Sequence, residues 1–297
     1  MKTVDDFFNL APEKSLFHYS SIGALLGIEK SETLWASNVY YLNDGEEIIY
    51  AKRIFEKLIG EKQLQVEGKE AEFLIQFREW LKPFGDKAFN LFVFSLSEEQ
   101  NQLSQWRSYT PHGRGISIGF SPLIVNKIAQ KNSLRIAKCC YDQQEHKDVM
   151  NSLLQKMIIT FNQHSPNIDP KGFSVHQRYH IFIEQFRGDI LQVFAIIKNP
   201  AFKEEKEWRL ISNYFPKYTV EEIKYREGAS MLVPYIELNL ERWHNPPQHS
   251  HPVLFESVCL GPSPYSELSF NALSQFLSNK KVTHLTINSR VPYRKWQ

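Results

Sequence analysis

The sequence has few features that would place it in a specialised class. Among 297 residues there are only three cysteines, Cys139, Cys140 and Cys259. An odd number with an adjacent pair suits neither a disulfide framework nor a zinc motif, and indicates a reducing cytoplasm. The formal net charge is +2, so the chain has no bulk electrostatic attraction to nucleic acid or membranes.

Long apolar runs and targeting signals are also missing. No run approaches the roughly 18–20 apolar residues that span a bilayer. The N-terminal residues MKTVDDFFNL carry two acids where a signal peptide carries bases, and no apolar core follows. We found no internal repeat, low-complexity tract or obvious linker. We therefore expect a cytoplasmic protein with no membrane partner, folded as a single domain over residues 1–297.

The composition that remains is that of a globular protein. Hydrophobic residues make up 42% of the chain and charged residues 23%, which are ordinary fractions. Aromatic residues reach 13%, enough either to fill a large core or to line a stacking pocket. Both interpretations remain open from composition.

Short strands at both ends of the chain, with helices between them, predict an α+β fold. The order predicts mixed, mainly antiparallel sheets with flanking helices. Residues 143–198 are expected to form a mainly helical insertion, interrupted by the polar segment NQHSPNIDPKG. Strands are expected at 16–20, 33–37, 91–97, 115–121, 134–142, 205–212, 231–240, 255–261 and 284–289. Other helices are expected at 21–30, at 46–81 as a pair, at 100–109 and at 266–278.

The segment EKEWRL places acidic and basic groups on one side of an expected strand. Alternation puts Glu205, Glu207 and Arg209 on one face, while Trp208 and Leu210 face a core. One interpretation is a solvated edge whose salt bridges contribute less than about 1 kcal/mol each. The other is a carboxylate held by arginine, able to stabilise a cation or orient a hydroxyl.

Two further strands carry polar residues. Ser95 and Ser97 share one face of the strand FVFSLS, where small hydroxyls could contact a ligand or bond neighbouring backbone. His18 and Tyr19 lie on opposite faces of the first strand. A lone strand histidine is compatible with a structural or a catalytic role.

The stretch SNVYYLNDGEEII combines a helix start with aromatic residues. Asn43 or Asp44 can cap the following helix, and Glu47 lies near its positive end. Capping does not require Tyr40 and Tyr41. We therefore expect this turn to form one wall of a cleft, with the tyrosines as ligand contacts.

Familiar catalytic motifs are absent. His176 and His180 are four residues apart, but the glutamate of a zinc-protease motif and a third ligand are missing, so no metal is expected. The chain has no GxSxG elbow, and its glycines do not follow phosphate-loop or dinucleotide spacing.

Several segments in the same order resemble the bacterial family catalogued as domain of unknown function 2971. The resemblance runs from about residue 16 to residue 294. The segments are LFHYSS, LWASNVYYLNDGEE, FSLSEEQNQLSQWRSY with GRGISIGF, FKEEKEWRLI, YREGASMLVPYIEL, SVCLGP and TINSRVPYR.

The order of elements in that family is in turn similar to the ADP-ribosyltransferase fold. That superfamily carries His or Arg on its first strand, Tyr or Ser on a middle strand, and a late Glu, often as Glu-x-Glu. The corresponding positions would be His18, then Ser95 or Ser97, with Tyr40 or Tyr41 as the aromatic option, and then Glu205 and Glu207.

This resemblance implies NAD as a substrate. Glu207 would hold a ribose hydroxyl and stabilise the oxocarbenium charge, Glu205 would position or deprotonate the acceptor, and His18 would bind the adenosine-side ribose or phosphate. The implied NAD contacts are His18, Tyr19, Tyr40, Tyr41, Ser95, Ser97, Arg209 and Arg226, with Asn43, Asp44, Glu47 and Trp106 shaping the site.

The leading hypothesis is an NAD-consuming transferase or glycohydrolase, a toxin or effector in bacterial anti-phage defence. It would act on a protein or nucleic-acid acceptor and could need an antitoxin or activating partner. One alternative is a non-catalytic nucleotide- or protein-binding module. Another is a metal-dependent phosphodiesterase using Asp44, Glu47 and Glu207. We expect Glu207→Gln to abolish NAD turnover and leave thermal stability nearly unchanged.

Overall fold

The fold is organised around one large sheet. A computed structural model describes residues 3–8, 10–42, 46–84, 89–164, 174–216, 220–228, 230–244 and 251–289. In this part of the chain the sheet has ten strands, all antiparallel to their neighbours except β9 and β10. The expected mainly antiparallel α+β architecture is therefore confirmed. The strands are β1 (Leu16–Ser20), β2 (Thr33–Asn38), β3 (Phe92–Ser97), β4 (Ile116–Phe120), β5 (Arg135–Lys138), β6 (Glu207–Ile211), β7 (Lys224–Glu227), β8 (Leu232–Asn239), β9 (Ser257–Leu260) and β10 (Thr286–Asn288).

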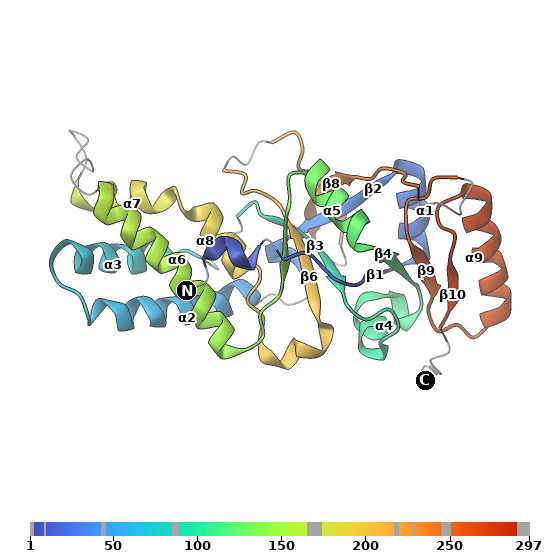
Figure 1. The fold of residues 1–297 in the computed structure, drawn as a ribbon, viewed down its shortest axis with the longest axis horizontal. Coiled ribbons are helices and arrows are strands. Elements are labelled where there is room, and N and C mark those ends of the chain that lie inside the picture. The colour runs from blue at the N-terminus through green and yellow to red at the C-terminus, as the bar shows by residue number, and fades with distance from the viewer. Residues whose placement is uncertain are drawn as a thin grey trace.

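The molecule is elongated, with a helical lobe at one end (Figure 1). The lobe packs α6, α7 and α8 against α2 and α3, so it is built from two separate stretches of the chain. The helices are α1 (Ile22–Ser31), α2 (Glu47–Gln63), α3 (Gly68–Leu81), α4 (Leu103–Tyr109), α5 (Pro122–Lys131), α6 (Gln143–His164), α7 (Val175–Glu184), α8 (Arg187–Phe194) and α9 (Ser266–Lys280). Most of the polar interruption NQHSPNIDPKG lies outside the described residues.

Much of the aromatic content fills the core of the helical lobe. Phe73 stacks on Phe161 at a centroid distance of 4.6 Å, and Phe55 meets Phe77 edge to face at 5.5 Å. A second buried cluster lies between the sheet and helices including α5 and α9. None of the described helices is long and apolar enough to cross a bilayer.

The sheet forks where β1 and β2 approach β3. β1 pairs with β3 at Phe17 and Ser97, whereas β2 pairs with β3 near Ser37 and Val93. Between these points, residues 94–96 of β3 have no strand partner on this edge among the described residues. Their other edge is fully paired with β6. Helix α1 joins the two diverging strands, and its residues line a hollow beside them.

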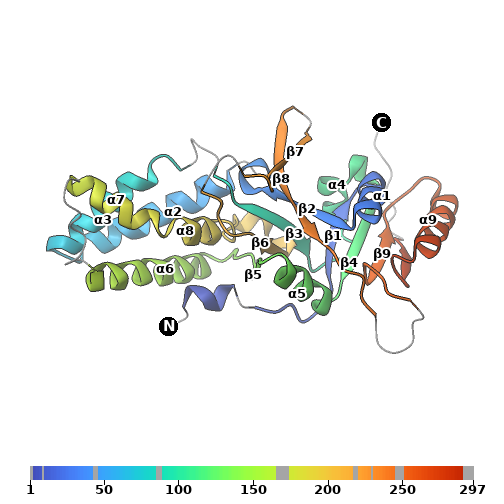
Figure 2. The ribbon, with the colours of Figure 1, turned by 90° about the horizontal axis from the view of Figure 1, so that it is seen from above.

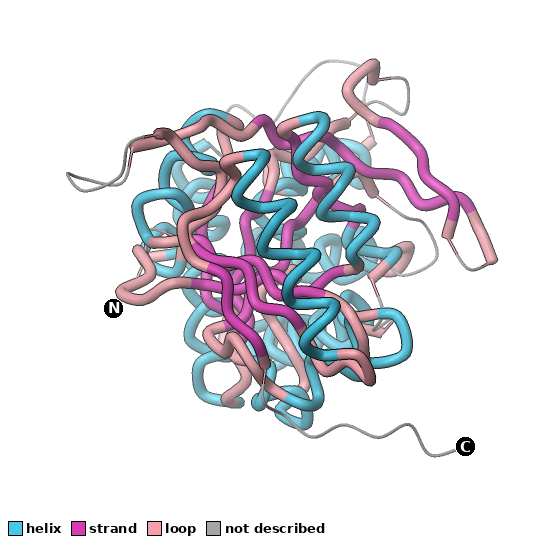
Figure 3. The backbone as a smooth tube through the Cα atoms, turned by 90° about the vertical axis from the view of Figure 1, so that its right-hand side faces the viewer, coloured by secondary structure: helices cyan, strands magenta, loops and turns pink. Residues whose placement is uncertain are grey.

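Two elements were not predicted from the sequence. Helix α5 begins where the Ser121 hydroxyl accepts a hydrogen bond from the Ile124 amide, with Pro122 in the first turn, which is a favourable helix start. Strand β7 pairs with β8 to form a two-stranded ribbon that stands out from the body (Figures 2 and 3).

One expected strand begins later than predicted. Pro200–Glu205 forms a 3₁₀ helix, and Lys206 adopts a left-handed conformation with φ of 44°. A left-handed residue interrupts an extended chain, so β6 begins at Glu207. Glu205 is therefore not part of the strand.

Candidate functional site

The fork in the sheet opens into a cleft of about 380 Å³. The cleft lies on the face of β3 and β6 where Ser95 pairs with Arg209 and Ser97 pairs with Glu207. Its volume is within the range of small-molecule sites. Ten residues that the sequence analysis selects lie along its wall: His18, Tyr19, Tyr41, Glu47, Ser95, Ser97, Glu205, Glu207, Arg209 and Arg226.

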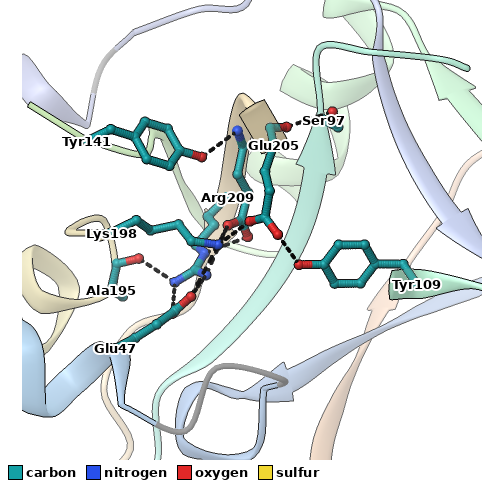
Figure 4. A network of polar contacts seen from close by, with 9 residues as sticks. Glu47, Ser97, Tyr109, Tyr141, Ala195, Lys198, Glu205 and Arg209 are labelled. Carbon is teal, nitrogen blue, oxygen red and sulfur yellow. Dashed lines mark hydrogen bonds and ion pairs between the residues drawn. The ribbon is translucent and has the colours of Figure 1, made fainter. Parts of the chain in front are cut away.

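A buried ionic network forms the inner end of the cleft (Figure 4). Lys198 lies at its centre, with Nζ 2.7 Å from Glu207 Oε2, 3.2 Å from Glu47 Oε1, and in contact with Glu205. Arg209 donates from Nε to Glu207 Oε1 over 2.7 Å and from Nη2 to Glu47 Oε1 over 3.0 Å. The Lys198 side chain is only 3% exposed.

This geometry excludes the solvated-edge interpretation of EKEWRL. Glu207 and Arg209 do share a face, but both are buried. Glu205 reaches the same lysine from the 3₁₀ segment, not from the strand. The Ser97 hydroxyl fixes that segment by donating to the Glu205 carbonyl over 2.8 Å. The left-handed Lys206 thus brings two carboxylates to one cation.

Opposing electrostatic effects act on the network. Burial by itself would raise the pKa of Glu207, but Arg209 and Lys198 outweigh it and lower that pKa to about 2. Burial would lower the pKa of Lys198, but nearby Glu207 and Glu47 raise it above its ordinary value. Three carboxylates face two cations, so the network keeps one net negative charge.

Glu205 is the carboxylate most open to the cleft. Its side chain is 12% exposed, compared with 8% for Glu207. The Tyr109 hydroxyl, at the end of α4, donates to Glu205 Oε1 over 2.5 Å. Burial, with a contribution from Glu205, raises the pKa of Tyr109. A tyrosine and a lysine therefore hold this carboxylate at the boundary between network and cleft.

His18 lies at the fork itself. Its Nδ1 donates to the Ser95 carbonyl over 3.0 Å, on the edge of β3 that lacks a strand partner. The ring stacks on Phe94 at 4.4 Å. Burial lowers the pKa of His18, so the neutral ring, with Nε2 as an acceptor, is favoured. The ring can therefore accept a hydrogen bond from a ligand hydroxyl.

The lowered pKa of His18 predicts a pH-dependent stability. The folded protein favours neutral His18, whereas the unfolded chain takes up the proton near pH 6.5. The unfolding free energy should therefore fall as the pH drops below 6.5, by at most about 1.4 kcal/mol per pH unit from this group. Denaturant titrations between pH 7.5 and 5 should show a shallower fall in His18→Gln. Identical slopes would contradict the assignment.

The two serine candidates differ in whether their hydroxyls are already hydrogen-bonded within the protein. Ser97 is used internally, because it also accepts from the Glu99 amide over 3.1 Å. The Ser95 side chain lines the cleft and has no hydrogen-bond partner among the described residues. Tyr19 lines the cleft too, but its hydroxyl donates to the Glu99 carbonyl over 2.6 Å. Of the two serines, Ser95 is therefore the one whose hydroxyl is available to a ligand.

The remaining predicted residues differ in how they are placed relative to the cleft. Tyr40 does not line the cleft, since it packs into the helical-lobe core near Phe89, whereas Tyr41 does. Trp106 is fully buried and supports Tyr19 edge to face at 4.7 Å. Arg209 is a cleft residue, but its hydrogen bonds go to Glu207, Glu47 and Ala195, so it does not act as a direct ligand contact. Asn43 and Asp44 lie outside the described residues.

Sequence reasoning missed Lys198 and Tyr109. Lys198 ends the apolar run VFAIIK, and Tyr109 precedes a Thr-Pro pair at a helix end, so each resembles an ordinary boundary residue. Within the described residues, no group of three His, Cys, Asp or Glu side chains has the arrangement of a metal site. The three network carboxylates are engaged by Lys198 and Arg209 instead.

Comparison with known proteins gives a single match, which is to a family model. No curated protein and no solved structure matches the chain, so the similarity to ADP-ribosyltransferases gains no support from relatives. Residues 105–210, which include Tyr109, Lys198 and the Glu205–Arg209 segment, match the family model described as protein of unknown function (DUF2971).

Proposed function

We propose that the cleft binds NAD and cleaves its nicotinamide–ribose bond, as an ADP-ribosyltransferase or NAD glycohydrolase. The observation that carries the proposal is the net negative, largely buried carboxylate network next to an open cleft. Breaking this bond develops positive charge on the ribose. Fixed negative charge in a site shielded from water stabilises such a transition state more than it would in bulk solvent.

The reaction uses the two more exposed network carboxylates. The C1′–N bond breaks and its electron pair goes to the pyridinium nitrogen, so that neutral nicotinamide leaves. Glu207 and Glu205 face the resulting oxocarbenium ion. An acceptor oxygen or nitrogen then bonds to C1′, and its proton passes to Glu205. With water as acceptor, the products are ADP-ribose, nicotinamide and a proton.

The surrounding residues suit this ligand. His18 can accept a hydrogen bond from a ribose hydroxyl through Nε2, and Ser95 offers a small hydroxyl on the cleft wall. Tyr41 provides an aromatic ring for the nicotinamide. Lys198 fixes the carboxylates in advance, so that little reorganisation is needed during the reaction.

The test is the release of nicotinamide from NAD by the purified protein, followed by chromatography. We expect release that depends on the folded protein, either with water alone or after addition of protein or nucleic acid as acceptor. Appearance of ADP-ribose on an added macromolecule would identify a transferase. NAD binding without release under any of these conditions would reject the proposal and favour a binding module.

A further inference from the structure

A second hollow adjoins the carboxylate cleft on the side of α1. Its volume is about 620 Å³, and it shares seven lining residues with the first cleft, including His18, Trp35 and Arg226. The two spaces therefore meet at the fork between β1 and β2. The residues of the ionic network do not line this hollow, so the network does not account for what the hollow could bind.

An aromatic wall bounds the hollow. Trp35 of β2 is 48% exposed, an unusual position for the largest side chain on a sheet. Its ring rests on Tyr235 of β8, with centroids 4.5 Å apart and an angle of 32° between the planes. Tyr235 is buried, so it holds the indole in one orientation. A fixed, exposed indole suits the stacking of a planar base.

A cation lies next to this wall. Arg226 of β7 lines both spaces, and its Nη2 is 3.4 Å from the Ser37 hydroxyl. Among the described residues, no carboxylate lies within ion-pair distance of its guanidinium. This differs from Arg209, which is paired with Glu207 and Glu47. An unpaired guanidinium in a hollow can bind a phosphate.

Small residues of α1 keep the hollow open. Gly23, Gly27 and Ser31 are spaced four apart and line the same space. A Cβ placed on Gly27 would meet no atom within 4 Å, and one on Gly23 would meet only the Ser21 hydroxyl at 3.7 Å. A side chain at position 27 would therefore begin in free space on the wall of the hollow.

We infer that this hollow binds a nucleoside monophosphate unit. The base stacks on Trp35, the phosphate pairs with Arg226, and a ribose hydroxyl reaches His18. Such a unit has two sources: the adenosine half of NAD, or a separate nucleotide that receives ADP-ribose. Both sources depend on the proposed function, whereas binding of the unit itself does not.

The test is calorimetric titration of AMP into the full-length protein. Gly27→Leu should weaken binding at least 10-fold by filling the hollow, and Trp35→Ala should weaken it roughly 10- to 100-fold through lost stacking. Arg226→Gln should weaken AMP and leave adenosine unchanged. The matched control is Gly60→Leu in α2, where an added Cβ also meets nothing within 4 Å but the residue lines neither the cleft nor the hollow.

Each outcome of these titrations leads to a different conclusion. If saturating NAD prevents AMP binding, the hollow holds the adenosine half of the dinucleotide. If AMP and NAD bind together, it holds a separate nucleotide. Absence of AMP binding to the wild-type protein, or equal binding by wild type and Gly27→Leu, would overturn the inference. AMP binding without any NAD turnover would uphold it and reject only the proposed function.

Discussion

Lys198→Met is expected to lower the unfolding free energy by about 3–5 kcal/mol, because it leaves Glu205 without a cation and leaves Glu47 and Glu207 with Arg209 alone. Lys198 touches all three acids and is almost fully buried. Methionine has a similar length and does not leave a large cavity. The loss therefore reports unpaired charge in a region of low dielectric. Denaturant unfolding followed by tryptophan fluorescence measures it.

Two further variants test whether the loss of stability comes from unpaired charge in the network. Lys206→Met removes a lysine that pairs with Glu99 at the surface, and should leave the unfolding midpoint nearly unchanged. Adding Glu207→Gln to Lys198→Met removes one stranded carboxylate, so the double variant should be less destabilised than the sum of the single variants. Wild-type stability in Lys198→Met would contradict a pairing role for the network.

Lys198→Met should also change how the unfolding free energy depends on pH in the acid range. The lowered pKa of Glu207 contributes stability that is present above the unfolded value of 4.5 and lost as the pH falls toward about 2. Without Lys198 this contribution shrinks. The stability gap between wild type and Lys198→Met should therefore narrow below pH 4.5.

Glu205→Gln is expected to reduce nicotinamide release about 100- to 1000-fold, the usual effect of removing one group that stabilises transition-state charge. Stability should change little, because Lys198 keeps Glu47 and Glu207 as partners. The amide can still accept a hydrogen bond from Tyr109. Initial rates with NAD, compared with melting temperatures on the same samples, separate the two effects.

The adjacent Glu204 is the matched control. It is exposed and makes no contact with the network, so Glu204→Gln should keep full activity. Equal rates for Glu205→Gln and wild type would remove Glu205 from the reaction. Glu207→Gln is a poorer test than the sequence suggested. Because Glu207 is buried and bonded to both Lys198 and Arg209, its loss should also destabilise the fold.

Local patterns predict most strands and helices of this protein. The alternation in FVFSLS and the helical spacing in IGALLGIEK depend on neighbouring residues, and β3 and α1 appear where those patterns place them. The sequence alone does not reveal the fork. It depends on which residues of β1 and β2 pair with β3, and these contacts are distant in the chain.

The candidate site likewise combines residues that local patterns select with a residue that only long-range contacts reveal. His18, Ser95 and Glu207 were selected from their strands, and neighbouring strand pairing brings them to one cleft. Lys198 could not be selected, since its partners lie at positions 47, 205 and 207 and meet it only in the folded chain. A lysine at the end of an apolar run is otherwise typical of a chain that returns to solvent.

Adjacent residues also differ in ways that a pattern does not show. Tyr40 and Tyr41 belong to one short 3₁₀ turn, yet only Tyr41 reaches the cleft. Strand alternation was assumed across Glu205 and Glu207, but Lys206 adopts a left-handed conformation that is uncommon outside glycine and asparagine. Such a backbone choice is set by tertiary contacts, including the hydrogen bond from Ser97 to Glu205.

The most direct test of NAD cleavage in this cleft is a crystal structure of Glu205→Gln soaked with NAD. The slowed reaction should leave the NAD intact. We expect the nicotinamide ribose in the carboxylate cleft, with C1′ beside position 205 and a ribose hydroxyl within hydrogen-bond reach of Glu207. NAD bound elsewhere, or bound with its nicotinamide ribose directed away from the network, would contradict it.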